Sequence, residues 1–107
     1  MESKSYWPVT DLRETHARFR HACDQVVLLN NHIESAQTRF QRVVKNGHQP
    51  LRYVLRMKVH SFERVRDMFY AYAHDLATVM NQLQVRIQEE GVVDLQDVLV
   101  EIGVVTQ

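Results

Sequence analysis

The feature that most constrains the fold is a pattern of apolar residues at heptad spacing in a segment free of helix breakers. No Gly or Pro occurs between Thr10 and Lys45. Two rows of residues recur there every seven positions: Leu12, Phe19, Val26, Ile33 and Phe40, and, three places after each, Thr15, Ala22, Leu29, Ala36 and Val43. Nine of these ten residues are apolar. The pattern therefore predicts a long helix with a seam for a partner helix.

A second segment without Gly or Pro, from Leu51 to Glu90, carries a broader apolar face. One heptad row is entirely apolar and comprises Leu55, Phe62, Phe69, Leu76 and Leu83. A row on one side of it comprises Leu51, Lys58, Val65, Tyr72, Val79 and Arg86, and Val54 and Met68 lie on that same side. A row on the other side comprises Val59, Ala73, Met80 and Ile87. This face is wider than one neighbouring helix requires. We assign the row that begins at Leu51 to the seam and expect another element to cover the row that begins at Val59.

The residues between these two segments predict a sharp reversal of the chain. Gly47 suits the left-handed stop of one helix, and Pro50 suits the first position of the next. A linker this short makes the two helices antiparallel, with facing residues whose numbers add up to about 96. Each large residue of the Leu12 row then faces a large residue of the Leu55 row.

A short third helix is predicted after Gly91, where Asp94 can cap its start and Gly103 can stop it. It either folds back over the open end of the hairpin, which we favour, or docks on another chain. The sequence thus predicts an all-α fold in one helical domain over residues 1–107, with helices at about 10–45, 50–90 and 94–102. This fold is a long antiparallel two-helix coiled-coil hairpin plus a short C-terminal helix, which completes a bundle with another chain or copy.

Composition excludes several classes of protein. Gly and Pro total five in 107 residues, too few for the turns of a β-sandwich. No apolar run approaches the ~18 residues that a membrane span requires, so we expect none. Cys23 is the one cysteine and cannot form an internal disulfide. Together with the lack of a secretory signal, this predicts an intracellular, cytoplasmic location.

Charge is distributed unevenly, although the formal net charge is zero. Residues 1–66 contain twelve Lys and Arg against six Asp and Glu, and residues 67–107 contain one against seven. The basic residues nearest the predicted turn form a group that we call the basic tip: Arg39, Arg42, Lys45, Arg52 and Arg56. The tip can contact an acidic partner, although solvation of exposed helix faces explains the same charges and is the interpretation we favour.

Sites for catalysis, metals and cofactors are not expected. Of the six histidines, His60 alone has another His, Glu or Cys at the three- or four-position spacing of a helical metal site, with Glu63 three positions later, and a single such pair is a weak signal. Cys23 flanks the predicted seam, where a cysteine usually acts as a small apolar residue. No glycine-rich phosphate loop or nucleophile elbow is present. We therefore expect no enzyme activity.

The favoured function is that of a non-enzymatic structural or assembly protein, a hairpin subunit of a larger complex. A cytoskeletal or ciliary complex would suit the basic tip. The expected partner surface comprises Val59, Ala73, Met80, Ile87 and the outward-facing Tyr70, and the partner is a second copy or another helical chain. The alternative is a module that binds nucleic acid or an anionic surface through the basic tip. Nucleic acid is less favoured because no base-reading motif accompanies the charge.

Overall fold

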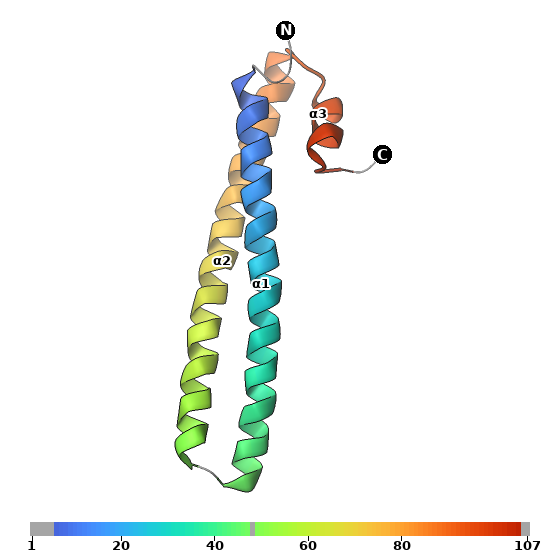
Figure 1. The fold of residues 1–107 in the computed structure, drawn as a ribbon. Coiled ribbons are helices and arrows are strands. Elements are labelled where there is room, and N and C mark those ends of the chain that lie inside the picture. Colours follow the sequence, from blue (N-terminus) through green and yellow to red (C-terminus); the bar gives the residue numbers. More distant parts are fainter. Residues whose placement is uncertain (1–5, 48, 106–107) are drawn as a thin grey trace. The chain divides into compact units, whose positions relative to one another are not determined.

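The computed structural model describes residues 6–47 and 49–105 and consists of three helices (Figure 1). They are α1 (Trp7–Asn46), α2 (Gln49–Glu90) and α3 (Leu95–Ile102). The helical hairpin with a short C-terminal helix is the fold that the sequence predicts, and each helix bound lies within three residues of its expected position. None of these helices is both long enough and apolar enough to cross a membrane.

The chain forms two compact units. Unit 1 joins the chain up to His21 to the chain from Tyr72 onward, and unit 2 is Ala22–Ala71. Unit 1 therefore contains the start of α1, the end of α2 and all of α3, whereas unit 2 contains two helical segments. The expectation of one domain over residues 1–107 stays a prediction.

Unit 2 is a two-helix hairpin. Its α1 segment buries Ala22, Val26, Ile33 and Ala36, and its α2 segment buries Leu55. Contacts between the two segments join residues whose numbers add up to 94 or 96: Asn30 with Arg66, Phe40 with Arg56, and His32 with Phe62. This register confirms the one predicted from the length of the turn. Gly47 has a φ of 76°, the left-handed conformation that ends α1.

Unit 1 has a core made by three helices. Its buried cluster draws on every element of the unit and comprises Tyr6, Val9, Leu12, Met80, Leu83, Ile87, Val98 and Leu99. Val98 and Leu99 lie on α3, so the short helix folds back within its own chain, as favoured from the sequence. Arg13 Nη2 on α1 donates to Glu101 Oε1 on α3 at 2.9 Å, so an exposed hydrogen bond also joins α3 to α1.

The ends of α3 follow the predicted chemistry. The side chain of Asp94 accepts a hydrogen bond from the backbone N–H of Asp97 at 3.1 Å, and Gly103 is left-handed with a φ of 93°. The N–H of Gly103 donates to the carbonyls of Leu99 and Val100. An eight-residue helix is marginal by itself, so these caps and the buried face both hold it in place.

Candidate interaction surfaces

The surface that the sequence assigns to a partner lies largely inside the protein. Ala73, Met80 and Ile87 have exposed fractions of 8%, 7% and 0%, and Val59 is half-buried. The expectation that this row faces a partner is wrong for the three unit 1 residues. The physical reason is that Met80 and Ile87 belong to the core of unit 1, in which α1 and α3 already cover that side of α2, and that Ala73 is likewise buried within the chain. Tyr70 is the one member of the expected surface that is exposed.

The row assigned to the seam lies instead on the outside. Leu51, Val65, Tyr72 and Val79 are each 41–43% exposed, and the neighbouring Val54 and Met68 reach 55% and 70%. The Val59 row of α2 therefore lies on the side toward α1, and the Leu51 row lies on the side toward solvent. The Leu51 row contains two charges, Lys58 and Arg86, against one, Arg66, in the Val59 row, and this difference is the sequence signal that distinguishes the two rows.

The exposed residues form what we call the α2 stripe. Its spacing alternates between three and four positions, and its members are Val54, Lys58, Ser61, Val65, Met68, Tyr72, Asp75 and Val79. All eight are exposed, and all lie on one uninterrupted helix. The first five belong to unit 2 and the last three to unit 1. Within each unit, the stripe has the three-four spacing by which one helix packs against another.

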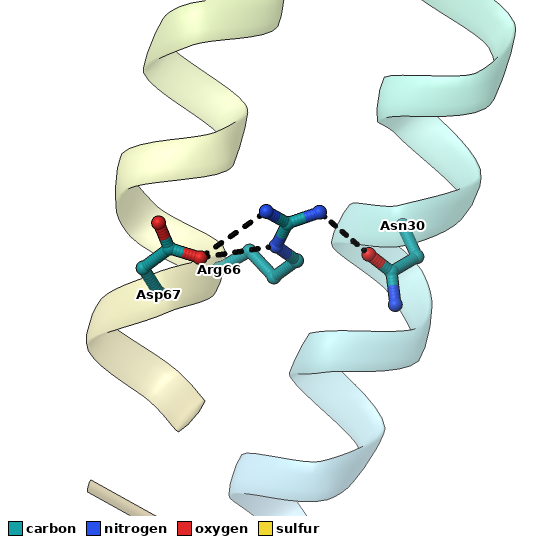
Figure 2. Close-up of polar contacts among 3 residues, drawn as sticks. All are labelled: Asn30, Arg66 and Asp67. Atoms are coloured by element: carbon teal, nitrogen blue, oxygen red, sulfur yellow. Dashed lines mark hydrogen bonds and ion pairs between the residues drawn. The ribbon is translucent and has the colours of Figure 1, made fainter. Parts of the chain in front are cut away.

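Arg66 shows how the buried side of α2 accommodates a charge (Figure 2). It occupies the heptad row of Val59 and Ala73, but its guanidinium lies at the edge of the contact between α1 and α2. Nη1 donates to Asn30 Oδ1 on α1 at 3.3 Å, and Nε and Nη2 donate to Asp67 Oδ1 at 3.2 Å. A charged residue thus fits an otherwise apolar row because its polar end reaches solvent and two acceptors.

The basic tip lies in unit 2 and is mostly exposed. Arg39, Arg42, Lys45 and Arg56 are exposed, and Arg52 is half-buried. The Arg56 guanidinium lies 5.8 Å from the centre of the Phe40 ring. Residues 35–62 contain six Lys and Arg and neither Asp nor Glu. Arg52 Nε is buried without a hydrogen-bond partner among the described residues.

An open pocket of about 300 Å³ lies beside the tip in unit 2 and is lined by Gln37, Phe40, Arg56, Val59 and His60. It exists because two helices cannot enclose their largest residues. Phe40 and Val59 stay half-buried here, whereas three helices enclose the core of unit 1. The pocket is open and mostly apolar; Arg56 and His60 are the basic residues in its lining, and no acidic side chain of the described residues lines it.

The titratable side chains of the described residues are not grouped as a metal site requires. No three His, Cys, Asp or Glu side chains within residues 6–47 and 49–105 are placed to hold a metal ion. His16 is buried, and its pKa is lowered by burial and by the nearby charge of Arg20. Burial raises the pKa of Tyr6, whose hydroxyl donates to Glu90. Cys23 is half-buried, and His48 lies outside the described residues.

Comparison of this chain with models of protein families, with curated proteins and with solved structures gives no match.

Proposed function

We propose that this protein is a non-enzymatic assembly subunit that binds a helical protein partner through the α2 stripe. The observation that carries the proposal is the exposure of Val65 and Met68, at 41% and 70%, in the middle of a helix. Single exposed apolar residues are ordinary, but exposed apolar residues that recur at three-four spacing along one helix face are typical of a helix that packs against a further helix.

The packing of the chain supports this assignment of the face. The opposite side of α2 is filled by Ala73, Met80 and Ile87 within the chain, so it is not accessible to a partner. Contact between the stripe and a partner helix removes apolar surface from water, at about 25 cal/mol per Å². An intracellular complex is the proposed setting, because Cys23 has no cysteine partner in the chain. A cytoskeletal or ciliary complex, with the basic tip on an acidic filament surface, is a more specific form of the same proposal.

The test is capture of the partner from the native source by cross-linking, with the wild-type chain beside the double variant Val65→Asp, Met68→Asp. Both changes add charge to exposed positions, so helicity and the thermal midpoint should stay close to the wild-type values. Loss of the captured protein in this variant alone supports the proposal.

The matched control is Val27→Asp, Leu28→Asp, which places the same two charges at exposed apolar positions of α1. Equal capture by wild type and both variants contradicts the proposal. Capture lost equally in both variants contradicts it as well, because the loss would then not depend on the stripe.

A second candidate function is binding of nucleic acid or another anionic surface through the basic tip. The run of six basic residues without an acidic one between positions 35 and 62 favours it. Phosphate contacts release counterions, so such binding falls steeply as salt rises, whereas packing between apolar helix faces responds little. Titration of a fluorescent duplex DNA at low and at physiological salt separates the two functions. No binding at low salt excludes nucleic acid as the partner.

A further inference from the structure

We infer that the α2 stripe binds the α2 stripe of a second copy in an antiparallel register, in which Lys58 faces Asp75 of the other chain. The inference rests on the proposed function and names its partner. It follows from the order of residues along the stripe and from the opposite charges of Lys58 and Asp75.

The two units differ in charge. Unit 2 contains eight Lys and Arg against four Asp and Glu, while unit 1 contains five against nine. The α2 segments follow the same rule: residues 49–71 carry five basic and two acidic side chains, and residues 72–90 carry one and three. An antiparallel α2 pair in which Lys58 faces Asp75 sets that acidic residue against the basic segment of the other copy, whereas Glu89 and Glu90 lie past the start of the other α2. A parallel pair places like charges together.

The register follows from how antiparallel coiled helices pair. Each residue of the Leu51 row faces a residue of the row containing Val54, Met68 and Asp75 on the partner helix. One register sets Val65 against Met68 and Val54 against Val79. In that register Lys58 faces Asp75, so the two charges of the stripe neutralise each other, twice per dimer.

Neighbouring registers lack this match. A shift of one heptad in one direction sets Asp75 against Leu51 and Lys58 against Met68. A shift in the other direction sets Asp75 against Val65 and Lys58 against Gln82. Either shift places a charge against an uncharged residue and leaves both charges without an opposite. A pair of charges within an apolar seam adds little stability but specifies one alignment.

The charges of this pair are accessible in the single chain. Lys58 is exposed, and the side chain of Asp75 is 84% exposed. Asp75 Oδ1 lies 4.0 Å from Nδ1 of the adjacent His74, whose side chain is also 84% exposed. Neither side chain is part of the core, so each can be changed without disturbing the fold.

Reversal of the two charges tests the inference. In analytical ultracentrifugation the wild-type chain should sediment as a dimer, and Lys58→Asp or Asp75→Lys alone should raise the dissociation constant by about tenfold or more. The double variant Lys58→Asp, Asp75→Lys should restore the wild-type value to within about threefold. An equimolar mixture of the two single variants should form a heterodimer, since each chain then supplies the charge that the other requires.

The matched controls reverse charges at exposed positions of α1, Arg18→Asp and Asp24→Lys, and should dimerise like the wild type. Circular dichroism confirms that every variant is folded. The register is overturned if the dissociation constant of the dimer is the same in the wild type and both single variants, or if the double variant does not restore the wild-type value. A wild-type chain that stays monomeric at its highest soluble concentration overturns the self-association. In that case, capture of a different protein that Val65→Asp, Met68→Asp abolishes still supports the proposed function, so the two failures are distinguishable.

Discussion

Truncation of Ile87 to Ala distinguishes the observed core from the arrangement that the sequence favours. Ile87 has no exposed surface and lies in the three-helix cluster of unit 1. The substitution removes three carbon atoms, and at about 0.8 kcal/mol for each buried methylene the lost transfer free energy is about 2.4 kcal/mol. An unrelaxed void of roughly 60 Å³ adds about 1.4 kcal/mol, at about 24 cal/mol per Å³. We expect the free energy of unfolding to fall by about 3–4 kcal/mol.

The assay is urea denaturation followed by circular dichroism and by the fluorescence of Trp7. Trp7 is the one tryptophan and lies in unit 1, with the Arg86 guanidinium 4.6 Å from its ring centre. Fluorescence therefore reports on unit 1, whereas circular dichroism reports on all helices. Coincident transitions mean that the two units unfold together, and separate transitions mean that the loss must be read from the fluorescence curve.

Val85→Ala is the control, because Val85 lies on the same helix and is 55% exposed. It should change the free energy of unfolding by less than about 0.5 kcal/mol. If Ile87→Ala and Val85→Ala lose the same small amount, Ile87 is not a core residue and the burial argument for α2 is refuted.

Three further predictions concern other parts of the chain. Phe69→Ala should destabilise the protein clearly more than Tyr70→Ala in thermal melts, because Phe69 is half-buried and Tyr70 is exposed; equal losses would contradict the assignment of faces on α2. Asp94→Ala should lower the free energy of unfolding by about 1 kcal/mol in urea denaturation, because the α3 cap is lost. Asp94→Asn should keep most of the wild-type stability, and the same loss in both variants argues against a capping role. The lowered pKa of His16 means that the unfolded chain binds a proton more readily than the folded chain, so the free energy of unfolding should fall as the pH drops below 6.5. His16→Gln should reduce that loss, and a pH profile that does not change in the variant would show that His16 is not buried in its neutral form.

Much of the fold can be predicted from the sequence because local signals and heptad spacing agree. The residues that stop and start the helices, Gly47, Asp94 and Gly103, act as their types suggest. The register of the hairpin follows from the length of its turn, and the pair of Asn30 and Arg66 meets the expected spacing. These features depend on neighbouring residues or on the two adjacent heptad rows of α1, which together form a single apolar face.

The outer face of α2 could not be assigned in the same way. The Leu55 row is flanked on both sides by apolar rows, so periodicity alone permits α2 to be rotated either way. The choice depends on long-range packing, in which α3 returns to cover Met80 and Ile87 beside α1. Val65 and Met68 are exposed, so the candidate partner surface lies on the other side of the helix.

Hydroxyl-radical footprinting across a concentration series tests the assignment of these faces most directly. Met68, Met80 and Tyr70 lie on one helix and are 70%, 7% and 54% exposed, so mass spectrometry can compare them within one experiment. We predict that Met68 is modified rapidly in dilute solution and becomes protected as the concentration rises, while Tyr70 stays reactive and Met80 stays protected throughout. Equal modification of Met68 and Met80 in dilute solution, or a rate at Met68 that does not change with concentration, would contradict self-assembly through the α2 stripe.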